Sequence, residues 1–441
     1  MAKADIFDID ILSKMKTVHL IGVGGIGVSA IARMLLQDGK KVSGSNNEKT
    51  KITEELKKLG AKIYYKHEPK NIPKNVELIV YTAAVPATNP EMREARKRGV
   101  PVLSYPEMLG VLSASKHTIA VAGTHGKTTT TAMLAKIFKE AGLEPTAIVG
   151  SLVKTEEGDA LPTNFIAGKG KHFIVEACEY RRNFLNINPN VIVITNIDRD
   201  HLDYYKDLKD IQKAFAEFAA KLPKDGFLIC NISDPRLKPV IKKTLARVIN
   251  YATVPSKFKL KVPGEHNISN AKAAHATARA LGIGLKTVIS ALNKFGGTWR
   301  RFEFTKQLKS GAKLYNDYGH HPTEIEATLK AARSITGKKS RVIVVFQPHL
   351  YSRTKLLLKD FAKSFDYADQ VIVTDIYAAR EKNDKSIHAQ HLVNEINKKS
   401  GKAIYMKKFE DIADYINAAT DPGDIVILQG AGDVVKVGEI C

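Results

Sequence analysis

The sequence predicts an α/β protein with parallel sheets, and its 441 residues are expected to form three domains. Two observations support this prediction. Short apolar, β-branched runs alternate with helical patterns along the whole chain, which is typical of βαβ units. The chain also falls into three stretches that each open on a strand. We therefore expect domains at 1–112, 113–297 and 298–441.

The predicted strands are short runs rich in β-branched residues. They are expected at Thr17–Ile21, Leu78–Thr82, Thr118–Ala122, His172–Val175, Val191–Thr195, Val342–Phe346, Gln370–Thr374 and Ile425–Leu428. Helical patterns between them are expected at Thr129–Ala141, Ile211–Lys221, Ser269–Leu281 and Glu324–Ile335.

The composition, with 44% hydrophobic and 26% charged residues, is that of an ordinary soluble globular protein. Three scattered cysteines (Cys178, Cys230 and Cys441) are too few for a disulfide framework, so a reducing, cytoplasmic setting is expected. No apolar run approaches the roughly 20 residues that span a bilayer, and no membrane insertion is expected.

The formal net charge of +22 raises the alternative of an ATP-driven nucleic-acid-binding protein. However, no block of five or six like charges occurs, and no basic tail is present. A solvated, lysine-rich surface explains the charge better, and we expect no nucleic-acid partner.

A glycine loop follows the first predicted strand, where Gly22, Gly24 and Gly27 match G-x-G-x-x-G. Such a loop lets the backbone approach a pyrophosphate at a helix N-terminus, although tight turn packing alone also explains it. A dinucleotide site needs an acid about 20 residues further on, where this chain has Asn46. The loop therefore favours a diphosphate-bearing ligand over NAD, and an NAD-dependent oxidoreductase is disfavoured.

A short P-loop, Gly123-Thr-His-Gly126-Lys127-Thr128, lies between a predicted strand and a predicted helix. Its backbone N–H groups can converge on phosphate oxygens. Lys127 supplies a positive charge, and the Thr128 hydroxyl can bind Mg²⁺. Glu176 and His201 follow two neighbouring strands and are plausible metal partners, since ligands collect at the carboxyl ends of parallel strands. The sequence thus predicts that the chain binds ATP with Mg²⁺.

The last third of the chain places polar residues at strand ends and junctions. Asn267 or Ser269 could be a simple helix N-cap, or Asn267 could contact a base. Arg301 stands at a segment junction, and arginine neutralises a transferring phosphoryl group. The remaining residues of this group, which suit a carboxylate or amine substrate, are Asp317, His320, His321, His349 and Arg353.

Together these blocks resemble the Mur ligases, the ATP-dependent amide-bond enzymes of peptidoglycan synthesis. The blocks are HLIGVGGIGVSAIA, GTHGKTTTT, EACEY, TNIDRDHLD, PGEHNISNA, RRFE, DYGHHPTE and QPHLYSR. They cover essentially the whole chain and are most similar to those of the alanine-adding members. The resemblance implies a Rossmann-like UDP-binding domain, a central P-loop ATPase domain and a C-terminal Rossmann-like domain.

The resemblance also implies an activity: ligation of L-alanine to the lactyl carboxylate of UDP-N-acetylmuramate through an acyl phosphate. A sibling enzyme that adds a ready-made tripeptide is the alternative within the family. ATP and two Mg²⁺ ions, with Mn²⁺ as a substitute, are the implied cofactors. We expect a cytoplasmic enzyme that is a monomer or a weak homodimer.

The resemblance assigns roles residue by residue. Those implied for catalysis are Lys127, His201, Arg301, His320, His349 and Arg353. Those implied for the nucleotide are Gly123, Thr124, His125, Gly126, Lys127, Thr128, Thr129, Asn267, Arg301 and Asp317. Those implied for the UDP-sugar and the amino acid are Gly22, Gly24, Gly25, Ile26, Gly27, Ser45, Glu179, His349 and Arg353. The implied metal ligands are Thr128, Glu176 and His201.

Some positions depart from the pattern of the alanine-adding enzymes. Asn46 stands where an aspartate is common, and Cys178, Tyr180, Arg181 and Arg182 replace a more acidic stretch after Glu176. The arginines place positive charge where that pattern has negative charge, so the contacts to the muramate are expected to differ.

Overall fold

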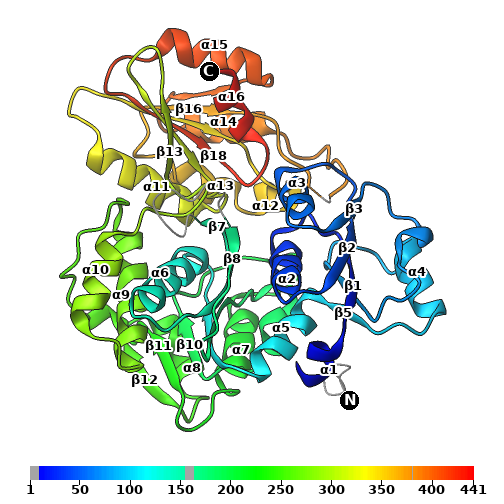
Figure 1. Cartoon of the computed structure of the whole chain (residues 1–441). Coiled ribbons are helices and arrows are strands. Elements are labelled where there is room, and N and C mark those ends of the chain that lie inside the picture. The colour runs from blue at the N-terminus through cyan, green and yellow to red at the C-terminus, as the bar shows by residue number, and fades with distance from the viewer. Residues whose placement is uncertain (1–8, 154–162, 380) are drawn as a thin grey trace. The chain divides into compact units, whose positions relative to one another are not determined.

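The computed structural model describes residues 9–153, 163–379 and 381–441. They form three sheets within two compact units (Figure 1). The first unit contains the described residues up to 199, together with 207–258 and 270–292. The second contains 200–206, 259–269 and the described residues from 293 to 441. The domain boundaries expected near residues 112 and 297 stay predictions.

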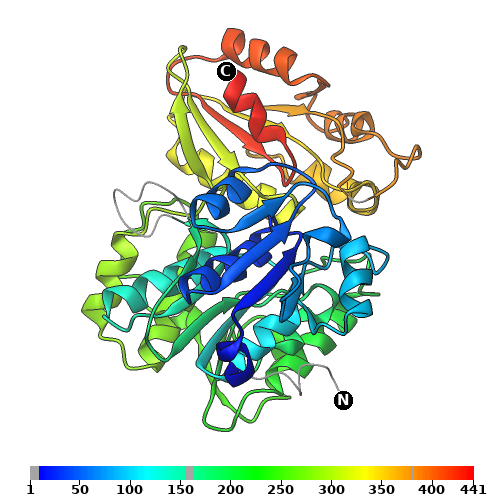
Figure 2. The same cartoon turned by 45° about the vertical axis from the view of Figure 1, so that its right-hand side comes forward.

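The first sheet has five parallel strands in the order β3-β2-β1-β4-β5, and its blue strands lie side by side in Figure 2. The strands are β1 (Thr17–Ile21), β2 (Lys41–Ser45), β3 (Lys62–Tyr64), β4 (Leu78–Tyr81) and β5 (Val102–Ser104). The helices are α1 (Ile9–Lys14), α2 (Ile26–Gln37), α3 (Lys51–Lys58), α4 (Pro90–Lys97) and α5 (Tyr105–Ala114), with a 3₁₀ turn at η2 (Pro69–Asn71). Every residue of β1 is buried, so helices cover both faces of this central strand.

The second sheet, also in the first unit, has the order β12-β11-β10-β6-β9-β7-β8, and only the β7–β8 pair is antiparallel among the described strands. Its strands are β6 (His117–Ala122), β7 (Thr146–Val153), β8 (Thr163–Ile166), β9 (His172–Glu176), β10 (Val191–Ile194), β11 (Phe227–Cys230) and β12 (Arg247–Asn250). Its helices are α6 (Lys127–Glu140), α7 (Leu208–Ala219), α8 (Lys238–Ile241) and α10 (Leu285–Asn293), and its 3₁₀ segments are η3 (Tyr180–Asn186), η4 (Pro235–Leu237) and η5 (Tyr251–Thr253). Helix α9 (Glu265–Ala280) belongs to the second unit up to residue 269 and to the first unit from residue 270.

The third sheet, in the second unit, has the order β13-β14-β18-β15-β16-β17, with β13 antiparallel at one edge. Its strands are β13 (Glu303–Gln307), β14 (Lys313–Asp317), β15 (Val342–Phe346), β16 (Gln370–Val373), β17 (Ala403–Tyr405) and β18 (Ile425–Gln429). Its helices are α11 (Pro322–Ile335), α12 (Tyr351–Leu356), α13 (Leu358–Lys363), α14 (Ala389–Asn397), α15 (Phe409–Ala419) and α16 (Val437–Ile440), with a 3₁₀ turn at η6 (Val434–Lys436). Two buried apolar clusters lie in this unit; Val342 and Val344 of β15 contribute to one and Ile343 and Val345 to the other. The central strand is therefore covered on both sides.

The expected α/β class with mostly parallel sheets is confirmed, and the eight predicted strands all form. None of the helices among the described residues is long and apolar enough to cross a membrane.

Within the first unit, the side chain of Asn164 on β8 connects the second sheet to α2. Its Nδ2 donates to Ser29 Oγ at 2.9 Å and also to the carbonyl oxygen of Ile26. Asn164 is fully buried. Because a buried amide needs hydrogen-bond partners, this contact fixes the start of α2, which is also the end of the glycine loop.

A buried carboxylate, Glu91 at the start of α4, organises the carboxyl end of the first sheet. It accepts hydrogen bonds from Ser45 Oγ at 2.5 Å and from Asn71 Nδ2 at 2.7 Å, and His19 Nε2 lies 3.6 Å away. Burial alone would raise the pKa of Glu91, but its interactions with His19, Ser45 and Asn71 outweigh burial and lower the pKa to about 2.

This lowered pKa predicts a loss of stability in acid. The folded-state pKa lies below the ordinary value of 4.5, so the contribution is fully present above about pH 4.5 and is lost as the pH falls toward 2. A shift of this size corresponds to up to about 3 kcal/mol of unfolding free energy. Urea unfolding between pH 7 and 3 should show this loss in the parent and a flatter profile in Glu91→Gln. Glu48→Gln, an exposed change near the same sheet, should keep the parental dependence of the unfolding free energy on pH. The same pH dependence in the parent and in both variants would contradict the prediction.

Candidate active site

The P-loop connects β6 to α6 in the first unit, and two glycines allow its shape. Gly123 and Gly126 have φ values of +127° and +84°, which L side chains rarely adopt. A Cβ at Gly123 would lie 2.1 Å from Thr195 Oγ1, and one at Gly126 would lie 2.2 Å from Asn270 Oδ1. The loop is therefore packed so closely that only glycine fits at both positions, and it leads directly into the N-terminus of α6.

Lys127 is the first residue of α6, and its side chain folds back over the loop. Its Nζ donates to the carbonyl oxygens of Gly123 and Thr124 at 2.5 and 3.0 Å and lies 3.0 Å from Glu179 Oε2. Burial alone would lower the pKa of Lys127, but the Glu179 carboxylate outweighs it and raises the pKa above its usual range. Lys127 is thus a buried cation that binds two carbonyl oxygens of the loop and pairs with Glu179.

Thr128 and Glu176 bring two hard oxygen ligands together. The Thr128 hydroxyl donates to Glu176 Oε2 at 2.9 Å, and the Gly150 N–H donates to the same oxygen at 2.9 Å. Oxygen ligands of this kind are those that Mg²⁺ prefers. The two residues therefore fit a divalent cation beside the P-loop. Thr129, the next residue, is buried within α6.

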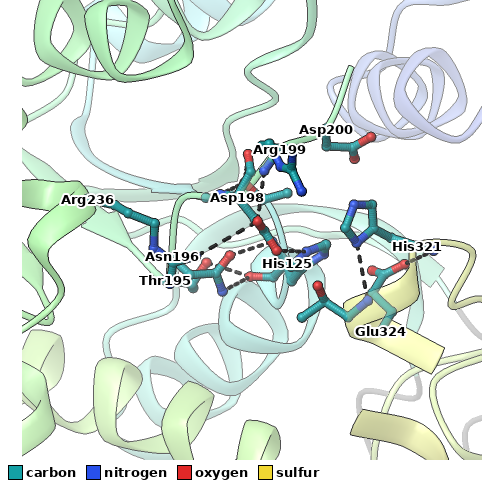
Figure 3. A network of polar contacts seen from close by, with 12 residues as sticks. His125, Thr195, Asn196, Asp198, Arg199, Asp200, Arg236, His321 and Glu324 are labelled. Atoms are coloured by element: carbon teal, nitrogen blue, oxygen red, sulfur yellow. Dashed lines mark hydrogen bonds and ion pairs between the residues drawn. The ribbon is translucent and has the colours of Figure 1, made fainter. Parts of the chain in front are cut away.

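A network of hydrogen bonds braces the loop from the end of β10 (Figure 3). The Asn196 side chain exchanges two bonds with the backbone of His125, both at 3.0 Å. The Asp198 N–H donates to Thr124 Oγ1 at 2.8 Å, and the Asp198 carboxylate lies 3.5 Å from His125 Nε2. His125 and Thr124, both expected at the nucleotide, are thus fixed by residues about 70 positions further along the chain.

The segment after Glu176 adopts an unusual backbone. Arg181 and Arg182 have φ values of +53° and +58°, which is strained for residues with a side chain. Arg182 is held by two acids of α7, at 2.8 Å from Asp210 and 2.6 Å from Glu217. The positive charge of Arg182 is therefore compensated within the first unit, and its N–H donates to the carbonyl oxygen of Glu179.

The glycine loop between β1 and α2 closes onto the ends of neighbouring strands. Gly22 has a φ of +77°, and the N–H groups of Gly22 and Val23 donate to the carbonyl oxygen of Ser45. Gly24 N–H donates to Asn46 Oδ1 at 3.3 Å, so Asn46 braces the loop from the position where a dinucleotide site needs an acid.

The other loop residues are also closely packed. A Cβ at Gly27 would lie 2.6 Å from the Tyr105 ring, Gly25 precedes α2, and Ile26 begins it. The hydroxyl of Ser45, expected at the substrate, is buried and bonded to Glu91.

In the second unit, Asp317 at the end of β14 uses both carboxylate oxygens to shape the segment around Arg301. Oδ2 accepts the N–H of Phe302 at 2.9 Å, and Oδ1 accepts that of Gly319 at 2.8 Å. Burial raises the pKa of Asp317, while Arg301 opposes this effect. Arg301 Nη1 lies 3.4 Å from Glu324 Oε1, so the arginine is fixed from two sides.

The interpretation of Asn267 or Ser269 as an N-cap is wrong. Helix α9 begins at Glu265, so both residues lie inside it. Gly264, with a φ of +102°, precedes the helix and accepts the N–H groups of Asn267 and Ile268. Asn267 is buried, and its Nδ2 donates to the carbonyl oxygen of Pro263 at 2.7 Å.

A row of rings lies at the carboxyl ends of β14 and β15. The ring centroids of Tyr318 and His320 are 5.4 Å apart, those of His320 and His349 are also 5.4 Å apart, and His349 stacks on Tyr377 at 5.7 Å. Burial lowers the pKa of His320 to about 4, with Arg353 acting in the same direction, so its imidazole is neutral at pH 7.

Arg353, in the first turn of α12, pairs with Asp200 at 2.9 Å and lies 3.4 Å from His349 Nδ1. Burial would raise the pKa of Asp200, but His201 and Arg353 outweigh it and hold the pKa well below its usual range. His201 also belongs to this unit and has a φ of +53°. Thus the second unit groups His201, His320, His349 and Arg353 around the Asp200 carboxylate.

Three family descriptions match consecutive parts of the chain. Residues 17–117 match "Mur ligase family, catalytic domain", 121–256 match "Mur ligase middle domain", and 300–432 match "Mur ligase, glutamate ligase domain". A UDP-N-acetylmuramate–L-alanine ligase of Clostridium tetani is 42% identical over 98% of this chain and 99% of its own length. The chain belongs to the Mur ligase family.

Solved structures of Mur ligases have the same fold. A UDP-N-acetylmuramate–alanine ligase from Thermotoga maritima matches this Mur ligase with a TM-score of 0.79 and 28% identity, over 96% of this chain and 97% of the other. A murein peptide ligase from Psychrobacter arcticus has a TM-score of 0.71 at 21% identity, with 96% and 97% covered, which shows the shared fold. A relative from Acetivibrio thermocellus, named UDP-N-acetylmuramate–L-alanine ligase, is 41% identical over 97% of this chain and 96% of its own.

Sequence reasoning missed several contacts that hold the site of this Mur ligase. Glu179 was predicted at the substrate, but its ion pair with Lys127 was not predicted. Asp200 lies next to the predicted metal ligand His201 and pairs with Arg353, 153 positions away. Asn196 braces the P-loop. The only sequence signal was that these residues come soon after predicted strands. Such a position predicts that a residue lies at the carboxyl edge of a sheet, but it does not predict which side chain it contacts.

Proposed function

We propose that this Mur ligase joins L-alanine to the lactyl carboxylate of UDP-N-acetylmuramate, with conversion of ATP to ADP and phosphate, in peptidoglycan precursor synthesis. The observation that carries the proposal is the full-length identity of 40–42% to relatives named UDP-N-acetylmuramate–L-alanine ligase. The P-loop with its permanently charged Lys127 supports ATP as the phosphate donor.

The reaction needs two bond-forming steps. The lactyl carboxylate attacks the γ-phosphorus of ATP, and ADP leaves, which gives an acyl phosphate. The amine of L-alanine then attacks the acyl carbon, the amide forms, and inorganic phosphate leaves as the nitrogen loses a proton. Both steps concentrate negative charge, so fixed cations and N–H donors are the expected catalytic groups.

In the first unit, we assign the nucleotide phosphates to the P-loop. Its N–H groups other than those of Thr124 and His125, which donate to Asn196, would donate to phosphate oxygens, and Lys127 would exchange the carbonyl oxygens of Gly123 and Thr124 for phosphate oxygens. Thr128 and Glu176 would hold a divalent cation; when bound, Mg²⁺ or Mn²⁺ supplies charge that stabilises the transferring phosphoryl group. We assign the glycine loop Gly22–Gly27 to the uridine diphosphate. His201, which belongs to the second unit, is assigned to a second ion.

In the second unit, we assign Arg301 to the nucleotide phosphates, and Asn267 and Asp317 to the nucleoside. Asp317 would act by fixing the backbone around Phe302. His349 and Arg353 receive the amino acid. His320 Nδ1 lies 3.1 Å from the carbonyl oxygen of Tyr318. If Nδ1 carries the proton of this neutral ring, Nε2 is left as a hydrogen-bond acceptor that can orient the attacking amine.

An ADP-release assay with UDP-N-acetylmuramate, ATP and Mg²⁺ tests the proposal. We expect release that depends on L-alanine, weaker release with glycine or L-serine, and none with L-alanyl-γ-D-glutamyl-meso-diaminopimelate alone. Because one methyl group changes binding by only about 1–3 kcal/mol, the three small amino acids should differ by about 10- to 200-fold at most. Release only with the tripeptide would favour the peptide-recycling alternative and overturn the proposal. We further expect a monomer or weak homodimer, which sedimentation would test. We also expect a cytoplasmic location.

A further inference from the structure

The segment Asp375–Ala379, which follows β16, runs beside the residues that carry His349. The Tyr377 N–H donates to the carbonyl oxygen of Pro348 at 2.8 Å, and the Leu350 N–H donates to that of Tyr377 at 2.9 Å. These two bonds make an isolated parallel bridge between His349 and Tyr377. Tyr377 therefore fixes the backbone immediately before and after His349.

The ring of Tyr377 makes a second contact to His349. The two rings stack with centroids 5.7 Å apart and an angle of 19° between their planes. Tyr377 also packs against Gly432, where an added Cβ would lie 2.8 Å from the Tyr377 ring and 2.2 Å from Gln347 Oε1. Tyr377 is 38% exposed, and the backbone at residue 432 prevents its ring, and the imidazole stacked on it, from shifting toward that residue.

The backbone next to His349 is strained, and the Tyr377 bridge opposes the relaxation of that strain. Leu350 has φ +71° and ψ +134°, a region that residues with a side chain rarely occupy. Such conformations persist only where the surroundings over-determine them. Here the Leu350 N–H is bonded to Tyr377, and the Leu350 side chain is buried. The strain lies between the two residues assigned to the amino acid, His349 and Arg353.

The same stretch of chain continues to the helix that carries Arg353. Ser352, in the first turn of α12, donates its N–H to Glu381 at 3.1 Å, and its hydroxyl also donates to Glu381. Helix α12 has only six residues, so its orientation depends on such contacts more than on its own hydrogen bonds.

We propose that Tyr377 is a positioning residue that holds His349, and through the strained Leu350 turn also Arg353, in place for the amino-acid substrate. The inference rests on the proposed function, because that function assigns His349 and Arg353 to L-alanine. A displacement of about 1 Å in a substrate-positioning group can cost about 100-fold in rate, so a ring that prevents such a shift affects amino-acid use directly.

Two variants test this role in the full-length enzyme. Tyr377→Leu removes the ring and leaves the backbone bridge, whereas Tyr377→Phe keeps the ring. We expect Tyr377→Leu to raise the KM for L-alanine about tenfold or more, with the KM for ATP and for UDP-N-acetylmuramate within about twofold of the parent. Tyr377→Phe should restore all three values. An unchanged KM for L-alanine, or an equal rise of all three constants, would overturn the proposal.

Nuclear magnetic resonance measures the position of His349 without the reaction. With ¹³C-labelled histidine, the His349 signal, assigned through His349→Gln, should shift in Tyr377→Leu and stay in place in Tyr377→Phe. Gly432→Ala, which pushes on the ring, should reproduce the shift, whereas Gly337→Ala, where an added Cβ has its nearest neighbour at 3.5 Å, should not. An unmoved His349 signal in Tyr377→Leu refutes the positioning role. A parent enzyme without alanine-dependent ADP release refutes the proposed function instead.

Discussion

Lys127→Ala is expected to lower kcat for ligation by about 1,000-fold or more. Lys127 is the buried cation of the P-loop, bonded to two of its carbonyl oxygens and paired with Glu179 at 3.0 Å. Removal of a fixed donor aimed at developing negative charge typically costs about 100- to 1,000-fold, and this group also orients the phosphates. Steady-state ADP release, with the fold followed by circular dichroism, measures the effect.

The structure shows that the same change also removes the partner of a buried acid. Glu179 is 2% exposed, and breaking one side of a buried ion pair costs about 3–5 kcal/mol of stability. The double variant Lys127→Ala, Glu179→Gln also removes the charge of the acid that pairs with Lys127. We expect it to regain most of the stability that Lys127→Ala loses and to remain inactive. Recovery of activity along with stability would show that Lys127 acts only by supporting the fold.

A matched control lies on the same helix. Lys139→Ala changes an exposed lysine in the last turn of α6 and should keep both the stability and the activity of the parent. Near-normal turnover of Lys127→Ala would contradict the assignment of ATP phosphates to this loop.

The eight strands for which ranges were predicted agree with the structure almost to the residue, because they are the strongly buried strands of the three sheets. Thr17–Ile21 and Val342–Phe346 are β1 and β15 as expected, and every residue of both is buried. A run of β-branched and apolar side chains between polar turns has few alternatives in a parallel sheet.

Helix starts were less predictable, since they depend on caps and not on apolar periodicity. Helix α6 begins at Lys127, two residues before the expected start, because Gly126 takes a left-handed conformation directly before it. Helix α9 begins at Glu265, four residues early, after Gly264. In both helices the first turn carries polar residues that are assigned to the nucleotide. Such residues do not show the apolar periodicity from which helices are predicted.

The composition of the candidate site could be predicted, but its internal pairing could not. Lys127, Glu176 and Arg353 were recognised by motif, whereas their partners Glu179, Gly150 and Asp200 are set by tertiary contacts. Asp200 precedes a candidate metal ligand, and nothing in its local sequence indicates an arginine 153 positions away. Tyr377 carries no motif at all, and only the bridge to His349 shows its place.

Glu176→Gln is the second change with a large expected effect. The carboxylate accepts hydrogen bonds from Thr128 Oγ1 and Gly150 N through the same oxygen, both at 2.9 Å. Glutamine keeps the shape and one carbonyl oxygen, so the fold and the bond to Gly150 can persist. It removes the negative charge and one oxygen ligand from the divalent-cation site that we propose beside Thr128.

We therefore expect weaker metal binding together with slower turnover. Replacement of a residue that only supports a metal ligand typically lowers metal affinity about 10- to 100-fold. Loss of a direct, charged ligand should therefore raise the Kd for Mn²⁺ about tenfold or more. Electron paramagnetic resonance with ADP present measures this Kd. We also expect kcat to fall about 100-fold or more at a fixed Mg²⁺ concentration of roughly 1–5 mM, which is of physiological order. The reason is that a bound cation would stabilise the transferring phosphoryl group.

A higher Mg²⁺ concentration should recover part of the activity of Glu176→Gln, because mass action offsets a weaker site. Damage to the fold would not respond to the metal in this way. Glu140→Gln, at the exposed end of α6, should bind Mn²⁺ like the parent. If Glu176→Gln bound Mn²⁺ with unchanged affinity and still lost activity, Glu176 would act on the loop through Gly150 and Thr128 alone, and the cation would have to be held by other residues.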